Sequence, residues 1–406
     1  MRQMLMHANG QMLQTVVLKD GQLQEFYMER SGESGLAGNV YLGRVVNVLP
    51  GMQAAFVDIG LSKNAFLYID DLLHPHLDKQ PEQKPSIQSV VHAGQLLIVQ
   101  LIKEPLGTKG ARVTTHINLP GRSLVYMPRA DYIGVSKKIV DDQAREWLRQ
   151  IGEQLREGDE GIILRTAAAS ESESALAADF FQLRELWRKI EVYAKEYSSP
   201  MILHSEADLM QRVVRDRLTA DIDEIWIDDQ ARYADASALV ALMTPSLTDR
   251  LRLYKNKGQQ SIFEYFQVDE QMNLAFGRRI PLASGGYMIW DETEALTVID
   301  VNTGKFIGSH ALEDTVFQTN MEAAELISRL LRIRDVGGIV IIDFIDMELE
   351  ANKQLILSRM TEAAKEDGTK CSIVGWTKLG LMELTRKKSR ESNLHRIKEA
   401  CHVCGK

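Results

Sequence analysis

Two aspartates that end apolar segments have the types and spacing best suited to chemistry. In the segment Ala295–Asn302, four apolar or β-branched residues precede Asp300, and Asn302 follows two positions later. Residues two apart on a strand point to the same side, so Asp300 and Asn302 can address one point. The segment Gly338–Asp346 repeats the pattern, with Asp343 where its apolar run ends. We therefore expect the three side chains at the carboxyl-terminal ends of buried strands, where α/β sheets bind ligands.

An oxygen-only set of two carboxylates and one amide suits a hard cation, with Mg²⁺ as the first choice and Mn²⁺ as the alternative. Such an ion keeps several waters, acidifies one of them and neutralises charge on a phosphate undergoing cleavage. We therefore predict that Asp300 and Asp343, with Asn302, hold a hard divalent cation that acts on a phosphate ester. On the residues alone, each aspartate could instead end a strand or cap a helix, and Asp346 could be a further ligand or a cap.

The cysteines at the end of the sequence are a second candidate metal site. Cys401 and Cys404 have the spacing of half a tetrahedral zinc site, and the one remaining cysteine, Cys371, lies in an expected strand. A redox dithiol is an alternative, although no thioredoxin-like βαβ pattern surrounds the pair. A second alternative is that His402 supplies a ligand to the zinc. We expect two chains to donate one cysteine pair each, which predicts a homodimer joined by a shared zinc.

Other residues are suited to contact with RNA. Phe56 and Phe66 lie among small residues in a strand-rich region, where aromatic rings stack bases, although two core phenylalanines fit the pattern as well. Lys109 lies in a glycine-rich basic loop and could contact a backbone phosphate or simply be solvated. The apolar strand before Arg165 and Thr166 ends in a guanidinium and a hydroxyl, a pair that can bind a phosphate.

The overall composition is that of a globular protein of several domains. The chain has 406 residues, a formal net charge of −8 and 3 cysteines. It contains no apolar run of the roughly 18 residues needed to span a bilayer, no secretory signal and too few cysteines for a disulfide framework. We expect a cytoplasmic protein without an integral membrane segment. The negative net charge excludes nucleic-acid coating by bulk charge, but not local binding by clustered Lys and Arg.

The helices and strands that must position these residues form three regions with different sequence patterns. A hairpin is expected over 14–28 and a small Greek-key barrel of short strands from 39 to 103. Long helices are expected over 141–157 and 172–197, the second exposed or bridging. Beyond 202, strands over 224–227, 295–301 and 338–344 alternate with helices over 231–243, 312–334 and 351–366, which predicts a layered α/β domain with a largely buried sheet.

These motifs coincide with one family. Gly51–Gly60, Ile299–Asn302, Gly337–Met347 and Cys401–Cys404 occur in the same order as in the bacterial ribonuclease E/G family, which the chain resembles over almost its whole length. The absence of a large carboxyl-terminal tail makes the layout resemble the ribonuclease G type. The resemblance implies single-strand-specific endonucleolytic cleavage in rRNA maturation and mRNA turnover, leaving a 5′-phosphate and a 3′-hydroxyl and favouring 5′-monophosphorylated RNA.

The resemblance also implies a multidomain α+β and α/β fold. The implied parts are a ribonuclease H-like domain (1–35 and 210–277), an inserted OB-fold RNA-binding barrel (36–118), a 5′-end sensor domain (119–209), a deoxyribonuclease I-like catalytic domain (278–400) and a zinc-link (401–406). It further implies roles for single residues. These are magnesium binding by Asp300, Asn302 and Asp343, 5′-phosphate binding by Arg165, Thr166, Gly121, Val125 and Lys137, and RNA binding by Phe56, Phe66 and Lys109.

Two residues depart from the family pattern. Lys137 stands where the well-known members have an arginine, so the charge is kept but the forked geometry is lost. His402 replaces a proline between the zinc-binding cysteines, whose thiolates remain. The sequence also ends two residues after Cys404, where relatives continue into a small domain that supports association. We therefore expect a homodimer here, and a tetramer in a longer chain.

Three function classes remain at this point. The leading hypothesis is a metal-dependent RNA endonuclease. The second is an RNA-binding scaffold whose acidic strand ends are structural, and the third is a magnesium-dependent phosphatase or DNA nuclease. Substituting Asp300 and Asp343 separates the first two, and a comparison of RNA with DNA substrates separates the third.

Overall fold

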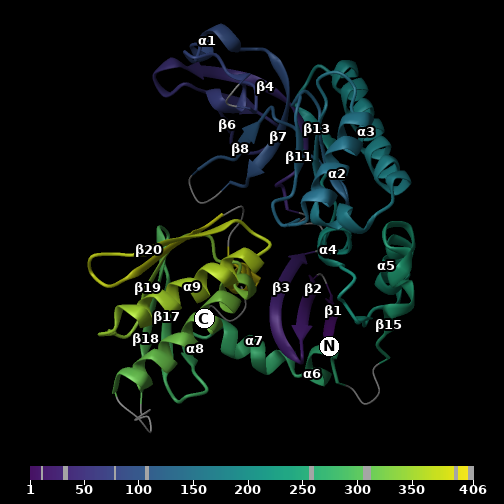
Figure 1. Cartoon of the computed structure of the whole chain (residues 1–406). Helices are drawn as coiled ribbons and strands as arrows, with labels where there is room; N and C mark the ends of the chain where they lie inside the picture. Colours follow the sequence, from purple (N-terminus) through teal and green to yellow (C-terminus); the bar gives the residue numbers. More distant parts are fainter. Residues whose placement is uncertain are drawn as a thin grey trace. The chain divides into compact units, whose positions relative to one another are not determined.

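The protein is described from a computed structural model, in which residues 1–10, 12–30, 35–76, 79–105, 109–255, 260–304, 312–387 and 392–400 are described (Figure 1). Its contacts divide the chain into two compact units. One comprises Glu33–Thr219 with Leu242–Pro245, and the other comprises Met1–Gly32, Ala220–Ala241 and Ser246–Lys406. Among the described residues, no helix is both long enough and apolar enough to cross a membrane. The overall class is mixed α and β, with one closed barrel.

The barrel forms the first part of the unit that begins at Glu33. Its strands are β4 (Val40–Leu49), β5 (Ala54–Asp58), β6 (Ala65–Tyr68), β7 (Leu96–Lys103) and β8 (Arg112–Thr114), with the short helix α1 (Ile87–Val90) between β6 and β7. The strand order is β4-β5-β6-β8-β7, and β7 pairs back onto β4, which closes the barrel. A Cβ at Gly43 would lie 2.5 Å from Val57 Cγ1, so only glycine allows β4 and β5 to cross this closely. The expected strand-rich barrel is confirmed.

The same unit contains a four-stranded sheet backed by two helices. Its order is β11 (Ile133–Val135), β12 (Gly161–Leu164), β10 (Leu124–Met127) and β9 (Leu119–Pro120), with helices α2 (Asp142–Leu155) and α3 (Glu173–Glu196). Helix α3 starts where the Ser172 hydroxyl accepts from Ala175 N, and it buries a stripe that includes Phe180 and Trp187 in the core. The expectation of an exposed or bridging helix is therefore wrong, because the apolar stripe packs on the sheet. β13 (Met201–His204) pairs with β4, and α4 (Leu209–Arg217) follows.

The other unit begins with a five-stranded sheet. Its order is β15 (Leu251–Leu253), β14 (Glu224–Ile227), β1 (Arg2–Asn9), β2 (Met12–Lys19) and β3 (Gln22–Arg30), with helices α5 (Gln230–Met243), α6 (Ile262–Tyr265) and α7 (Val268–Phe276). The predicted hairpin is confirmed as β2 and β3. Its turn residues Asp20 (φ 51°) and Gly21 (φ 75°) have the left-handed conformation that two-residue hairpin loops require. The sequence did not predict that β1 pairs in parallel with the distant β14.

A six-stranded sheet completes this unit. Its order is β16 (Arg279–Pro281), β17 (Tyr287–Glu292), β18 (Leu296–Asn302), β19 (Gly338–Asp343), β21 (Met382–Arg386) and β20 (Cys371–Trp376). Helices α8 (Leu312–Ile333) and α9 (Glu350–Glu366) lie beside it in Figure 1, and α10 (Asn393–Ala400) follows. The strands and helices expected beyond 202 are confirmed.

The six-stranded sheet differs from the predicted layered α/β sheet in two ways. Only β18 and β19 are parallel, and the other neighbouring strands are antiparallel. One face joins the core with α8 and α9, while the other leaves Val298 38%, Ile339 49% and Val374 65% exposed. A largely buried sheet was expected because apolar residues fill both faces of these strands. The structure places helices on one face only, which gives the alternating burial of half-covered sheets.

Candidate active site

The aspartates of β18 and β19 lie side by side. The two strands are parallel, and their register pairs Asp300 directly with Asp343. Neighbouring strands are about 4.8 Å apart and paired residues point to the same side, so the two carboxylates can bracket one small cation. Both aspartates lie on the exposed face, whereas Ile299 and Ile342 before them are fully buried. The buried apolar residues thus fix the strands that carry the exposed acids.

Asn302 and Asp346 complete this acidic end of the sheet. The Asn302 amide Nδ2 donates to Asp300 Oδ2 at 2.8 Å, so its amide oxygen remains available to a ligand. Partial burial, together with the charges of Asp300 and Asp346, raises the pKa of Asp343 above its usual 3.8. A bound cation would offset the charge that this environment disfavours on Asp343. In the described ranges no group of three or more His, Cys, Asp or Glu side chains is arranged to hold a metal ion.

A buried amide holds the segment after Asp343. Asn320, on α8, is fully buried. Its Nδ2 donates to the Ile345 carbonyl at 2.8 Å, and its Oδ1 accepts from the Ile345 N–H at 3.0 Å. Ile345 lies between Asp343 and Asp346, so Asn320 fixes the backbone that presents both acids. Sequence reasoning missed Asn320, because a single amide inside a long helix looks like part of its polar face.

Arg165 occupies a second polar site, in the other unit. It follows β12, and its Nη1 donates to the Gly121 carbonyl and to Asp216 Oδ1, each at 2.6 Å. Burial alone would raise the pKa of Asp216, but its ion pairs with Arg215 and Arg165 hold that pKa below its usual value. Neighbouring Arg122 is largely buried, its Nη1 donates to the Leu218 carbonyl at 3.1 Å, and its Nε lies 4.0 Å from Glu171 Oε1. Arg165 makes both of its hydrogen bonds to described residues through Nη1, so its remaining donors suit an anion.

The other residues expected to bind the phosphate with Arg165 lie in, or just after, strands of the same four-stranded sheet. The Thr166 hydroxyl lies 3.4 Å from the Ser136 hydroxyl, and the Gly121 N–H already donates to the Leu124 carbonyl. Val125 lies in β10 opposite Pro120 on one side and Ile163 on the other. The structure therefore places Val125 in β10, Gly121 directly after β9, and Arg165 and Thr166 directly after β12, three neighbouring strands of one sheet.

Two further residues near Arg165 are the exposed Lys137, which was expected, and Asp179, which the sequence did not reveal. Lys137 follows β11 and is exposed. Asp179, on α3, accepts from the Ser123 N–H at 2.8 Å, and a Cβ on Gly121 would lie 2.4 Å from Asp179 Oδ1. Asp179 therefore fixes the turn at Gly121. A lone acid on a helix carries no sequence signal for that role.

The two phenylalanines of the barrel lie outside its core. Phe56 on β5 and Phe66 on β6 are paired in register, with their rings edge to face and their centroids 6.1 Å apart. Both are half-buried, whereas their strand neighbours Ala55 and Leu67 are fully buried. Lys109 is exposed just before β8, whose Arg112 pairs with Phe66. The phenylalanine pair thus presents an aromatic surface next to cationic side chains.

The sequence has a basic run over 385–390, but one of its arginines is not available to RNA. Arg386, in the basic run 385–390, is 4% exposed and donates to Asp367 Oδ2 at 2.8 Å and to Asp335 Oδ1 at 2.9 Å. It is a structural ion-pair centre. Cys371 begins β20 with a half-buried thiol, whose pKa burial raises. Cys401 and Cys404 lie outside the described residues.

Comparison with known proteins identifies the family. The model of the ribonuclease E/G family matches residues 118–389. Ribonuclease G of Escherichia coli strain K12 is 44% identical over 390 residues, 95% of this chain and 79% of that protein. Ribonuclease G of Haemophilus influenzae is 40% identical over 99% of this chain and 82% of that protein. Ribonuclease E of Buchnera aphidicola is 35% identical over 100% of this chain and 45% of that protein. The chain therefore belongs to the ribonuclease E/G family and, as a member, is an endoribonuclease.

Proposed function

We propose that this enzyme cleaves single-stranded RNA with Mg²⁺, or Mn²⁺ in its place, held by Asp300, Asn302 and Asp343. The observation that carries the proposal is the parallel register of Asp300 with Asp343 on the exposed face of the six-stranded sheet. Two carboxylates and an amide oxygen match a hard cation that keeps most of its water ligands. The products are RNA ends carrying a 5′-phosphate and a 3′-hydroxyl, formed in rRNA maturation and mRNA turnover.

The chain's own residues supply charge and orientation. The cation would contribute Lewis acidity toward the phosphate and greater acidity of a bound water. Asp300 and Asp343 hold their carboxylates at one level of the sheet, and the Asn302 amide fixes Asp300 Oδ2 through its hydrogen bond. Partial burial, and then the charges of Asp300 and Asp346, raise the pKa of Asp343, and a bound cation would offset this cost of its charged form. Asn320 keeps the backbone between Asp343 and Asp346 in place.

Our proposal assigns RNA binding to the barrel. The closing pair β7–β4 and the strand order β4-β5-β6-β8-β7 support an OB-fold, a barrel type that binds single strands. Half-exposed Phe56 and Phe66 would stack bases, and Lys109 would contact a phosphate. Stacking requires unpaired bases, so this surface favours single-stranded substrate.

We further propose that the Arg165 pocket binds the 5′-monophosphate of the substrate, with Thr166, the backbone at Gly121 and Val125, and Lys137. Support comes from Arg165, which makes both of its hydrogen bonds to described residues through Nη1, and from the positions of these residues in, or just after, neighbouring strands of one sheet. The domain assignment proposed with it is a ribonuclease H-like part around β1–β3 and β14, and a deoxyribonuclease I-like part around the six-stranded sheet.

The remaining proposals concern assembly and location. Cys401 and Cys404 would bind a zinc shared with a second copy of the chain, giving a dimer, or a tetramer in a longer chain. A cytoplasmic location is proposed because a thiolate zinc site and 3 cysteines suit a reducing compartment.

The central test substitutes the paired acids. Asp300→Asn and Asp343→Asn should each lower Mg²⁺-dependent cleavage of a single-stranded RNA more than about 100-fold, since losing even an outer partner of a metal ligand costs about 10–100-fold. Binding of the same RNA should persist. The matched control is Asp291→Asn, which removes another exposed carboxylate on the neighbouring strand β17. Cleavage at the parental rate by either variant would overturn the site, and equal cleavage of matched DNA would overturn the RNA specificity.

A further inference from the structure

The contacts of Arg165 leave one side of its guanidinium open. Nη1 alone makes both contacts, to the Gly121 carbonyl and to Asp216 Oδ1. Within the described ranges, Nε and Nη2 have no hydrogen-bond partner, and 28% of the side chain is exposed. Two fixed contacts on one nitrogen set the plane of the group and turn its other donors outward. A guanidinium held in this way is prepared for a phosphate oxygen pair, which prefers a forked donor.

Asp216 holds Arg165 without competing for the open side. The same carboxylate forms a two-point ion pair with Arg215, whose Nε and Nη2 donate to Oδ1 at 3.1 Å and to Oδ2 at 2.9 Å. Arg215 and Arg165 share this carboxylate, and Asp216 contacts Arg165 only through Nη1. Asp216 is 27% exposed and Arg215 only 10%, so the pair is shielded enough to keep one geometry.

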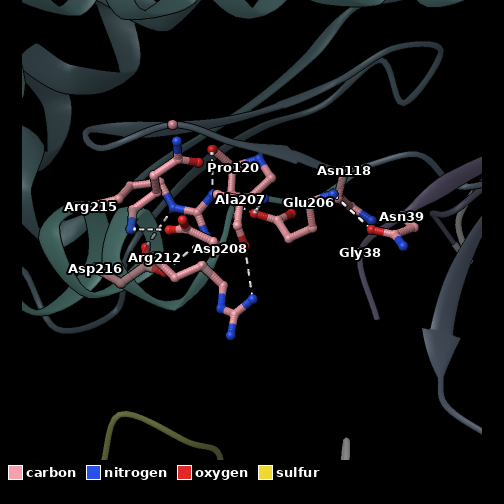
Figure 2. A network of polar contacts seen from close by, with 12 residues as sticks. Gly38, Asn39, Asn118, Pro120, Glu206, Ala207, Asp208, Arg212, Arg215 and Asp216 are labelled. Carbon is pink, nitrogen blue, oxygen red and sulfur yellow. Dashed lines mark hydrogen bonds and ion pairs between the residues drawn. The ribbon is translucent and has the colours of Figure 1, made fainter. Parts of the chain in front are cut away.

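Arg215 connects Asp216 to the start of the barrel through Glu206 and Asn39, which Figure 2 labels together. Arg215 Nη1 donates to Glu206 Oε1 at 2.7 Å and to the Pro120 carbonyl at 3.2 Å. The Glu206 N–H donates to Asn39 Oδ1 at 2.7 Å, and Asn39 directly precedes β4. One polar chain therefore runs from Asn39 through Glu206, Arg215 and Asp216 to Arg165. The contacts of Asp216 on α4 are fixed from both ends.

We propose that Asp216 is the positioning residue of the 5′-phosphate pocket: it orients Arg165 toward a terminal phosphate and so sets the preference for 5′-monophosphorylated RNA. This inference rests on the proposed 5′-end recognition by Arg165 and deepens it. Asp216 does not touch the phosphate. Its effect passes through the Arg165 guanidinium, and it is confined to substrates that carry the phosphate.

The test measures KM and kcat for one single-stranded RNA with a 5′-monophosphate and with a 5′-hydroxyl. Asp216→Ala should raise KM for the phosphorylated RNA at least fivefold and leave KM for the hydroxyl RNA within twofold of the parent. Asp216→Asn keeps an oxygen acceptor for Arg165 Nη1, so it should keep more of the preference than the alanine variant. Asp208→Ala is the control, because Asp208 is the exposed N-cap of the same helix, and its side chain accepts from Gln211 N. It should leave the preference unchanged.

The outcomes separate this inference from the proposed function. If Arg165→Ala abolishes the preference while Asp216→Ala retains it, the positioning role is wrong and 5′-end recognition stands. If the parent shows no preference and Arg165→Ala changes nothing, 5′-end recognition fails, and the inference fails with it. If Asp216→Ala raises KM equally for both substrates, Asp216 has only a structural role. Melting curves show whether Asp216→Ala is folded. If it is not, the KM values of Asp216→Asn for the two substrates decide whether Asp216 has the positioning role.

Discussion

Removing the Asn320 side chain should damage stability and metal use together. Asn320→Ala deletes both hydrogen bonds to Ile345, at 2.8 Å and 3.0 Å, and leaves a peptide N–H and a carbonyl without their partners. Each unpaired buried group costs about 1–3 kcal/mol, and Ile345 is only half-buried, so we expect a loss of about 2–4 kcal/mol. At about 2–4 °C per kcal/mol for a unit of this size, the melting temperature should fall by roughly 10 °C.

The same change should weaken the use of Mg²⁺ well below the melting temperature. Asp343 and Asp346 flank Ile345, so a freed segment no longer holds its acids in one place. Removing an outer partner of a metal ligand costs about 10–100-fold, and we expect the Mg²⁺ concentration for half-maximal cleavage to rise by that factor. Asn320→Asp keeps the acceptor for the Ile345 N–H, so its half-maximal Mg²⁺ concentration should lie between those of the parent and Asn320→Ala. Ser328→Ala, also on α8, loses a bond to the Ala324 carbonyl and one to Met360 Sδ on α9, neither of which involves Ile345, and it serves as the control. An Asn320→Ala protein with parental Mg²⁺ dependence at 20 °C would refute the positioning argument.

Three further predictions concern the RNA surface, the acidic cluster and the zinc. Phe56→Ala should weaken binding of a short single-stranded RNA by about 1–3 kcal/mol at little cost in stability. The control is Tyr265→Ala, which removes an exposed aromatic residue of the other unit and should bind this RNA as the parent does. If Phe56→Ala also binds it as the parent does, the Phe56 ring does not stack on a base. In EDTA at pH 7, Asp343→Asn should be more stable than the parent. The pKa of the Asp343 carboxyl is raised in the folded state, so its charged form destabilises the fold increasingly as the pH rises from 3.8 through that pKa. Denaturant titrations at pH 7 and in acid measure this, and an advantage that persists in acid would contradict it. Zinc analysis should find half an equivalent per chain, lost together with the dimer in Cys401→Ser, whereas one zinc per monomer would rule out a shared site.

The sequence predicted the elements whose pattern is local. β14 and α5 lie within a residue of expectation, because an apolar run or a helical period is written in adjacent residues. The acids of β18 and β19 were also recognisable, since each interrupts a continuous apolar run. The register that pairs them was not, because it depends on how α8 returns the chain to the sheet.

What the sequence could not predict depends on distant partners. The parallel pairing of β1 with β14 joins segments from opposite parts of the chain, and the open face of the six-stranded sheet depends on where α8 and α9 pack. Arg386 belongs to a run that is typical of RNA contact, yet two distant aspartates bury it. Asp216 was hidden for the converse reason, since an acid on a polar helix face carries no sign of the arginine it will meet.

The one-to-one register of Asp300 and Asp343 also limits how this protein can change during evolution. Side chains alternate between the faces of a strand, so an insertion of one residue within β18 or β19 would turn an acid toward the core and an apolar residue outward. An insertion in the connection between the two strands lengthens a crossover without altering the alternation, and it costs little. Relatives should therefore vary in length between the two strands and keep the spacing from each apolar run to its aspartate.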